Sequence, residues 1–462
     1  MDPRLAAAVS AGKAAGIATR ALRRGGGTAI PGLIAEKIAP DVAARLGRQL
    51  GRGCVLITGT NGKTTATRML AGCLREASVP YVNNREGSNL MRGIATALIA
   101  AAAPAGTIPH ARDVFGLFET DEATLPPATR ALHPKVITFT NLFRDQLDRY
   151  GEVDTVAAFW RAALRAAPCD ATLVLNADDP SVAELSLDWE GPIHWFGLAD
   201  AAFATGAGGA FDARWCRACG GTFSYERRYF AHIGYWQCTG CGRKRPATAT
   251  SASAVRLALD AASFELDGVG RVTMPVTGIY NVYNALAAIA TARVLGLAPG
   301  AITAGLSHAP AAFGRQERIE YGGRKLRLFL CKNPAGANQV IRLLSDLELP
   351  VPELNLALML NDRFADGQDV SWIWDVDYEL LAGRAAACWA GGDRAEDIAL
   401  RLKYAGWPPP RAVTHDPAVL LDTIVAGTAA ASDVFVIATY TAMLDLRAEL
   451  ARRGAVSPFW QK

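Results

Sequence analysis

The sequence predicts an α/β protein with a parallel, doubly wound sheet, a cysteine-rich segment inserted into it, and a second, smaller α/β domain. Strand-like and helix-like stretches alternate along most of the 462 residues. A glycine-rich turn ending in Lys-Thr-Thr follows a short apolar run, and the alternation breaks between residues 201 and 250. Alternation of this kind is typical of parallel sheets covered by helices, and the length exceeds what one core usually holds.

Composition narrows the class of protein. Half of the residues are hydrophobic and the formal net charge is only +4, which disfavours a nucleic-acid scaffold but suits a phosphorylated ligand. No stretch of eighteen apolar residues lacks a charge, and residues 1–50 carry no secretory pattern, so we expect a cytoplasmic protein. For the N-terminal segment we favour a helix packed on its own domain over one lying on a membrane surface.

The glycine-rich turn spans Gly59-Thr60-Asn61-Gly62-Lys63-Thr64-Thr65, directly after the apolar run 55–57. Backbone N–H groups of such a turn converge on phosphate oxygens, Lys63 can reach the β- and γ-phosphates, and Thr64 can hold Mg²⁺. The general phosphate-loop pattern would require glycine where Ile57 stands. We favour a nucleoside triphosphate site over a plain strand-turn-helix capped by threonine.

Elements after the turn continue the alternation. Helices are predicted at 64–77 and at 93–103, where Pro104 ends the second. A polar loop at 83–89 is a candidate substrate edge. Strands are predicted at 79–82, 114–119, 136–140 and 172–176. Ligands bind at the carboxyl ends of strands in such sheets, so the residues that follow them are site candidates.

Two such positions carry suitable chemistry. Glu119 closes its strand and is our first choice for a Mg²⁺ ligand beside Thr64, against the alternative of a solvated acidic residue at a strand end. The next strand ends in a polar connector, 140–151, and connectors of this density commonly carry function.

The inserted segment contains Cys216-x2-Cys219, eighteen residues, then Cys238-x2-Cys241. This spacing predicts a structural four-thiolate zinc ribbon, with Gly220 and Gly242 as the turn residues of its two knuckles. For the nearby Arg227, Arg228, Arg243, Lys244 and Arg245 we favour a solvated basic rim over a nucleic-acid contact. The cysteines outside the motif are expected to be core thiols: Cys54, Cys73, Cys169, Cys331 and Cys388.

The parent domain resumes near Val255 and reaches a helix that begins with Asn281 and Asn284 on one face. Two amides there can contact a base or cap the helix. We place the domain boundary near Phe313, which gives domains of 1–312 and 313–462. Further alternation follows, with helices predicted after Gly336 and at 396–404 and strands at 326–330, 354–360, 385–389 and 434–438. A polar loop at 360–377 holds Trp372 and Trp374, which either form a contact surface or pack within the loop.

Several motifs in this order resemble the Mur ligase family over most of the chain. They are Gly59–Thr65, Glu119, Thr140-Asn141, the run 176–180, the Asn281/Asn284 helix and Gly314-Arg315. The resemblance implies an ATPase domain in which the loop Gly59, Thr60, Asn61, Gly62, Lys63, Thr64 and Thr65 binds phosphates. It also implies that Thr64 and Glu119 bind magnesium, that Asn281 or Asn284 contacts adenine, and that Arg315 contacts ATP from near the hinge.

The chain departs from the broad family in three ways. Gln146 stands where many members have a magnesium-binding histidine, and the stretch 159–164 lacks the lysine that some members carbamylate. The phosphate loop also begins too early for a preceding domain that grips a UDP-sugar. Second-metal chemistry and soluble UDP precursors are therefore disfavoured.

A narrower resemblance, to the MurT group within that family, accommodates these departures. Chains of this group carry a four-cysteine ribbon, a Lys332-Asn333-Pro334-Ala335-Gly336 match, and Asp-x-Ser-Trp, here beginning at Asp369. The resemblance implies a partner glutamine amidotransferase of the GatD type, whose Cys-His-Asp triad Asp369 would complete; Asp375 and Asp377 are weaker candidates. The chain itself shows no amidotransferase nucleophile motif.

The resemblance implies ATP-driven amidation of the D-glutamate α-carboxylate in the lipid II stem peptide, with ATP, Mg²⁺ and Zn²⁺ as cofactors and Lys63, Glu119 and Asp369 as catalytic residues. The product would be D-isoglutamine, and membrane association would come only through the substrate. Two alternatives stay open: a related ligase acting on another carboxylate, as in folate or cyanophycin chemistry, and a zinc-ribbon protein that binds nucleic acid in a nucleotide-dependent manner.

Overall fold

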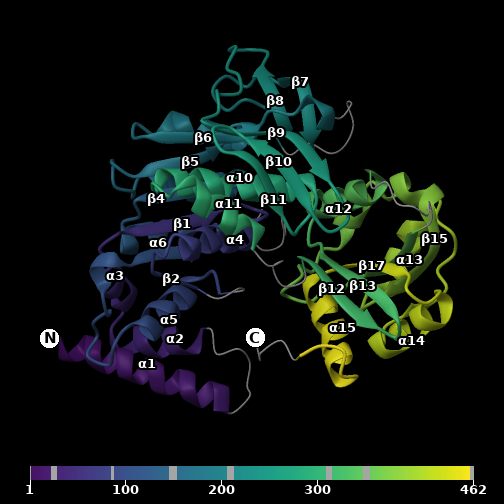
Figure 1. The fold of residues 1–462 in the computed structure, drawn as a ribbon, viewed down its shortest axis with the longest axis horizontal. Coiled ribbons are helices and arrows are strands. Elements are labelled where there is room, and N and C mark those ends of the chain that lie inside the picture. Colours follow the sequence, from purple (N-terminus) through teal and green to yellow (C-terminus); the bar gives the residue numbers. More distant parts are fainter. Residues whose placement is uncertain are drawn as a thin grey trace.

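A computed structural model describes residues 2–21, 29–84, 88–144, 153–204, 213–308, 315–346 and 354–457. Two sheets dominate it, and a two-stranded hairpin projects from the first (Figure 1). The larger sheet has nine strands in the order β11-β10-β9-β6-β5-β4-β1-β3-β2. Its strands are β1 (Cys54–Thr58), β2 (Tyr81–Asn83), β3 (Phe115–Glu119), β4 (Val136–Phe139), β5 (Thr172–Asn176), β6 (Ile193–Leu198), β9 (Thr250–Leu257), β10 (Ala262–Leu266) and β11 (Gly270–Met274).

Seven neighbouring strands, β2-β3-β1-β4-β5-β6-β9 in spatial order, run parallel. Strands β10 and β11 extend the β9 edge as an antiparallel meander. The predicted parallel sheet is therefore confirmed. The predicted strand at 79–82 forms two residues later, as β2.

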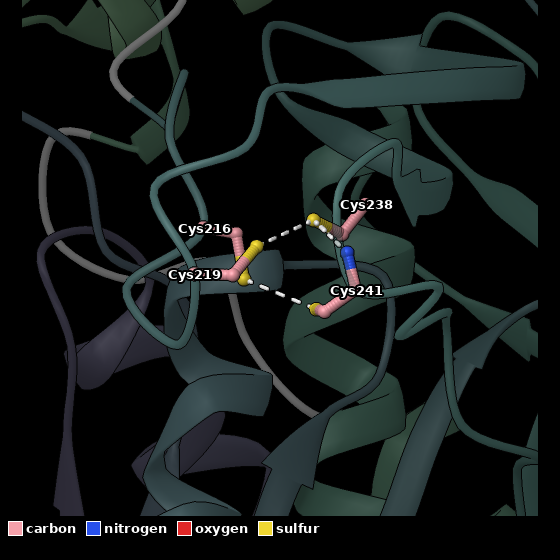
Figure 2. A group of neighbouring side chains, drawn as sticks. All are labelled: Cys216, Cys219, Cys238 and Cys241. Carbon is pink, nitrogen blue, oxygen red and sulfur yellow. Dashed lines mark hydrogen bonds between the residues drawn. The ribbon is translucent and has the colours of Figure 1, made fainter.

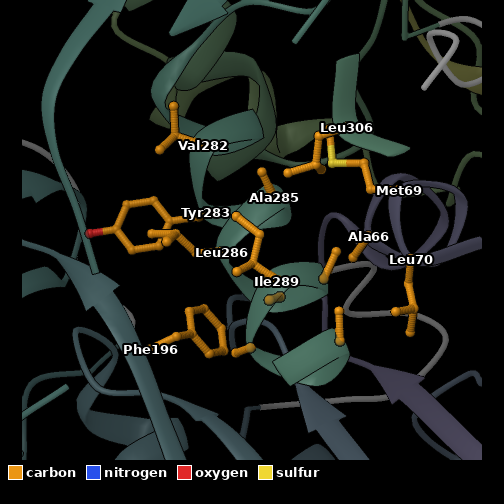
Figure 3. Packing of buried hydrophobic residues seen from close by; sticks show 14 of the residues in the cluster. Ala66, Met69, Leu70, Phe196, Val282, Tyr283, Ala285, Leu286, Ile289 and Leu306 are labelled. Carbon is orange, nitrogen blue, oxygen red and sulfur yellow. The ribbon is translucent and has the colours of Figure 1, made fainter. Parts of the chain in front are cut away.

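Helices cover both faces of this sheet. Alternate side chains of β1 point to opposite faces, so this strand contributes to the packing on each side. Val55 and Ile57 join a core formed with α4 (Lys63–Glu76), α10 (Ile279–Val294) and α11 (Pro299–Ser307), part of which Figure 3 shows. Cys54 and Leu56 face the other layer. That layer is built from α1 (Pro3–Ala21), α2 (Ile30–Ile38), α3 (Val42–Gly47), α5 (Met91–Ala101), α6 (Leu125–Leu132) and α8 (Val153–Leu164).

Helix α1 packs on its own domain, with Leu5, Ala8 and Val9 buried against α2 and α5. No helix within the described ranges combines the length and hydropathy that crossing a membrane requires.

Between β6 and β9 the chain leaves the sheet and forms the hairpin of β7 (Phe223–Phe230) and β8 (Ile233–Cys238), at the top of Figure 1. Phe230 pairs with Ile233, so only Ala231 and His232 form the turn, and Ala231 adopts a positive φ of 42°. Below, "the ribbon hairpin" denotes β7, β8 and this turn.

The second sheet has six strands in the order β12-β13-β17-β14-β15-β16, all parallel except the β12–β13 pair. The predicted helices near 336 and at 396–404 are present, as are two that were not predicted, α14 and α15. The strands are β12 (Arg315–Tyr321), β13 (Arg324–Leu330), β14 (Leu354–Met359), β15 (Ala385–Gly391), β16 (Val413–Thr414) and β17 (Asp433–Ala438), and the helices α12 (Pro334–Asp346), α13 (Ala395–Tyr404), α14 (Pro417–Gly427) and α15 (Tyr440–Arg452). The boundary proposed near Phe313 lies outside the described residues.

Candidate functional site

The turn between β1 and α4 requires both of its glycines. Gly59 and Gly62 have φ values of 137° and 86°, in the region that side chains rarely adopt. A Cβ at Gly59 would also clash with Thr140, and one at Gly62 with the amide of Asn284. Gly62 caps α4 without a side-chain hydrogen bond, and Gly62 and Thr65 line a cavity at the carboxyl end of β1, where the N-terminus of a helix can bind an anion.

The connector after β4 holds this turn in place. Thr60 donates its N–H to the carbonyl of Asn141 (3.0 Å), and the Asn141 side chain accepts from the N–H of Asn61 (2.9 Å). Thr140 donates its hydroxyl to the carbonyl of Asn61, while the hydroxyl of Thr60 and the backbone of Phe143 bond each other. The predicted functional loop thus supports the phosphate loop. Its residues 145–150, which include Gln146, lie outside the described ranges.

The Lys63 ammonium is bound within the protein. It donates to the carbonyls of Gly59 and Thr60 and lies 2.7 Å from the carboxylate of Glu122. Both side chains are buried. Burial raises the pKa of the Glu122 carboxyl, and the charge of Lys63 opposes that shift. The sequence did not single out Glu122, although it follows Glu119 by three residues at the same strand end.

Glu119 lies beside the turn, because β3 pairs with β1 in a register that places Glu119 next to Ile57. Asn84 fixes this strand end by hydrogen bonds to the Glu119 backbone N–H and carbonyl. The buried Glu119 carboxylate and the half-buried Thr64 hydroxyl form no hydrogen bond to the described part of the chain. These two oxygen atoms lie at the carboxyl ends of neighbouring strands, and oxygen ligands of this kind suit a hard divalent cation.

A cavity opens from the turn toward the second sheet and, with its solvent-filled mouth, measures about 880 Å³. Its lining includes Asn61, Gly62 and Thr65 of the turn and of α4, several aromatic rings, and residues of the second domain. The lining comprises Asn61, Gly62, Thr65, Asn141, Phe143, Asn176, Phe230, Tyr280, Asn281, Tyr283, Asn284, Phe329, Leu330, Lys332, Ala335, Gly336, Gln339 and Val340.

Both asparagines of α10 line this cavity, with Asn284 against Gly62. The amide of Asn284 donates to Asn281 (3.1 Å), and that of Asn281 donates to the carbonyl of Thr277 (2.7 Å). Asn281 therefore forms a hydrogen bond with the backbone at the start of the helix, and it also lines the cavity. Arg315 begins β12, and its side chain lies outside the described part.

The second domain contacts the turn and forms part of the cavity wall. Asn333, at the start of α12, donates to the side chain of Asn61 (3.2 Å). Lys332 precedes it and lines the cavity. Arg144 also reaches across, 2.7 Å from Asp375, in an exposed ion pair. The two predicted motifs, at the phosphate loop and at Lys332–Gly336, thus meet.

The four cysteines of the predicted ribbon are brought together (Figure 2). All four Sγ atoms lie within 4.8 Å of one another, with Cys216 to Cys241 at 3.8 Å and Cys219 to Cys238 at 3.4 Å. Tetrahedral Zn–S bonds of about 2.3 Å would separate sulfurs by about 3.8 Å. Gly220 and Gly242 both have φ of 72°, as expected of knuckle turns.

The basic rim is largely bonded within the protein. Arg245 pairs with the buried Asp178, and its guanidinium also lies over Tyr235, as does that of Arg227. Arg228 lies over Tyr225. Such cations are poorly placed to contact nucleic acid. Of the five cysteines outside the ribbon, Cys54, Cys73, Cys331 and Cys388 are buried as expected, and Cys169 is exposed.

Asp369 lies on the loop after β14, exposed, and is not among the described residues that line the cavity. Its carboxylate accepts the N–H of Ser371 (2.8 Å), and bonds from Ser371 hold its pKa below the usual range. The two tryptophans of this loop differ in burial. Trp372 packs against the core, whereas Trp374 is half exposed, with its ring centroid 5.7 Å from that of Tyr404, and its role as a contact surface stays a prediction.

Comparison with known proteins identifies the class. Residues 57–210 match the family model of the Mur ligase middle domain, and residues 330–443 match that of the MurT ligase C-terminal domain. The fold resembles a pseudomurein peptide ligase type C from Methanothermus fervidus, with a TM-score of 0.66 at 21% identity over 87% of this chain and 79% of that one. The family-model matches and the fold together define a Mur-type ligase.

Two curated relatives specify the group. The chain is 35% identical over 94% of its length, and 94% of the relative's, to the protein named lipid II isoglutaminyl synthase (glutamine-hydrolyzing) subunit MurT of Streptococcus pneumoniae. It is 33% identical over 88% of its length, and 90% of the relative's, to the protein of that name from Staphylococcus aureus. The chain belongs to the MurT family.

Proposed function

We propose that the chain is the ligase subunit of a lipid II isoglutaminyl synthase. ATP would phosphorylate the α-carboxylate of D-glutamate in the lipid II stem peptide. Ammonia would then attack the acyl phosphate and displace phosphate, which gives D-isoglutamine, ADP and phosphate. The single observation that carries the proposal is the joining of two motifs in one cavity: the Mur-type phosphate loop at Asn61 and the MurT-type start of α12 at Asn333.

The chain's own groups fit phosphoryl transfer. The loop N–H groups and Lys63 would neutralise charge on the transferring phosphoryl, which requires Lys63 to leave Glu122. The second domain would shield the acyl phosphate from water, and the Arg144–Asp375 pair supports such closure. We infer the corresponding division into an ATPase domain, 1–312, and a C-terminal domain, 313–462.

Two metals fit donors on this chain. Thr64 and Glu119 would hold Mg²⁺, which supplies charge neutralisation at the phosphates. Cys216, Cys219, Cys238 and Cys241 would hold a structural Zn²⁺, which stabilises the ribbon and leaves no open position for catalysis.

The ammonia source would be a second subunit, a glutamine amidotransferase of the GatD type. The words "subunit" and "glutamine-hydrolyzing" in the relatives' names support this. The exposure of Asp369 and its lowered pKa suit a carboxylate that orients a histidine of a partner. The enzyme would act on the inner face of the membrane, held there by its substrate.

The decisive experiment reconstitutes the chain with such an amidotransferase and follows lipid II by mass spectrometry. We expect amidated lipid II only when ATP and glutamine are both present, and none with Lys63→Ala. Full ATP turnover by Lys63→Ala would contradict the phosphate-site assignment. Amidation of a different carboxylate, with lipid II unchanged, would contradict the substrate.

A further inference from the structure

The ribbon hairpin has two ends with different surroundings. Cys238, the last residue of β8, belongs to the cysteine cluster. The opposite end, with Phe230 and His232, is buried inside the ATPase domain. Phe230 lines the cavity that begins at the phosphate loop. An inserted segment thus supplies part of the wall of the central cavity.

The hairpin is fixed in this position by hydrogen bonds to the parent domain. Trp236 donates its indole N–H to the carbonyl of Ala177 (2.9 Å), and Gly234 donates its N–H to the carbonyl of Asp178 (2.8 Å). The hydroxyl of Tyr229 donates to the carbonyl of Leu198 (3.2 Å). Hydrogen bonds from three buried donors of the hairpin to backbone carbonyls of the parent domain favour one docked arrangement.

The Asp178 side chain joins the same contact from the parent side. Its carboxylate is fully buried and accepts hydrogen bonds from Arg245, from the N–H of Leu198 and from the hydroxyl of Tyr283. Tyr283 belongs to α10 and lines the cavity beside Phe230. Asp178 therefore contacts the ribbon hairpin through its backbone carbonyl and contacts α10, the helix that carries Asn281 and Asn284, through its carboxylate.

The ring of Phe230 lies in an aromatic group at the cavity wall. Its centroid is 6.0 Å from that of Phe143, nearly parallel at 26°, and 5.6 Å from that of Tyr283, edge to face at 82°. The ring of His232 packs against that of Phe143, with the two ring centroids 4.6 Å apart. Aromatic faces accept nucleobases by stacking without regard to hydrogen-bond pattern.

The residues that line the cavity place the two parts of a bound nucleotide. A triphosphate bound by the turn would lie beside Gly62 and Thr65, and the same cavity is lined by α10 and the aromatic group, against which the base would lie. We propose that Phe230 of the ribbon hairpin forms the wall against which the nucleotide base packs, so that the inserted ribbon determines affinity for the base and not for the phosphates. This inference rests on the proposed function, because it takes ATP as the ligand of the cavity.

The test measures binding of ATP and of inorganic tripolyphosphate to the full chain by calorimetry. We expect Phe230→Ala to raise the Kd for ATP roughly tenfold, since one base–aromatic stack is lost. The Kd for tripolyphosphate, which has no base, should stay unchanged. Phe230→Leu should fall between. Phe223→Ala is the matched control, because Phe223 is on the same strand but packs on Trp236 at the ribbon.

The possible outcomes distinguish failure of this inference from failure of the proposed function. An unchanged Kd for ATP in Phe230→Ala would overturn the inference. Equal weakening of ATP and tripolyphosphate would also overturn it, because the hairpin would then only support the phosphate loop. If the unaltered chain binds neither ligand, the proposed function itself fails.

Discussion

At the scale of single residues, Lys63 is paired with a buried carboxylate, Glu122, which under the proposed function would compete with phosphate for the ammonium. We expect Glu122→Gln to lower the Kd for ATP about fivefold, because a neutral amide binds the ammonium less strongly than a carboxylate does. Calorimetric titration with ATP measures this.

Glu76→Gln is the control for that substitution, since Glu76 closes the same helix and faces His308 instead. Weaker ATP binding by Glu122→Gln would contradict the competition and would show that Glu122 itself contributes to the nucleotide site.

Asp369 gives a second residue-scale prediction. Because its side chain is exposed, Asp369→Asn should leave the fold intact, and the hydrogen bonds from Ser371 that lower its pKa favour the ionised carboxylate. Glutaminase activity of the reconstituted complex should fall by about two orders of magnitude or more, as when a triad loses its orienting carboxylate. Asp377→Asn is the comparison variant. If glutamine hydrolysis by Asp369→Asn matches that of the unaltered complex, the shared triad is wrong.

The sequence predicted local geometry best where the residues are contiguous. The glycine turn at Gly59 and Gly62 and the meeting of the two cysteine pairs are both present, while the ligands they would bind stay predictions. Glu122 was missed because Glu119, Asp121 and Glu122 are alike in sequence, and only the fold determines which one faces Lys63. Phe230 was missed for the same reason: it becomes a cavity wall only through hairpin register and distant contacts with Asp178.

At the scale of elements, the ribbon hairpin depends on its cysteine end. An isolated two-stranded hairpin is marginally stable, and structural zinc sites contribute folding free energy. Removing metal with a chelator should therefore speed amide exchange in β7 and β8, while β1 and β4 of the parent sheet stay protected. Exchange measured by mass spectrometry, alongside zinc quantification, tests this. Unchanged exchange after complete loss of zinc would show that docking alone holds the hairpin.

The predicted strands at 114–119, 136–140 and 172–176 are present as β3, β4 and β5, because buried strands are short apolar runs that end at polar residues. The parallel strands β6 and β16 were not predicted. Helices α14 and α15 were not predicted, and the role of the connector at Thr140 and Asn141 was only partly anticipated. It was expected to carry function, yet its observed bonds go to the phosphate loop. Such contacts arise from pairing of β1 with β4, which the sequence does not display.

At the scale of the whole molecule, Asn333 links the two domains through Asn61 at the phosphate loop. Asn333→Ala should loosen closure and let water reach the acyl phosphate. We expect ATP consumed per amide formed to rise at least about twofold, measured as ADP against amidated lipid II.

Asn355→Ala is the matched control, because Asn355 bonds the Asp433 carbonyl within the second sheet. A ratio that stays at the unaltered value in Asn333→Ala would contradict the role of this contact in closure.

The place of the ribbon in the chain has a consequence for engineering. β6 and β9 are adjacent parallel strands, so the chain between them must run back from the end of β6 to the start of β9. In most α/β proteins a helix makes that return, held by its own backbone hydrogen bonds. Here the segment that includes the ribbon makes it. A ribbon-free version would therefore need a replacement crossover of about a dozen residues or more, and it would leave Phe143 and Tyr283 uncovered.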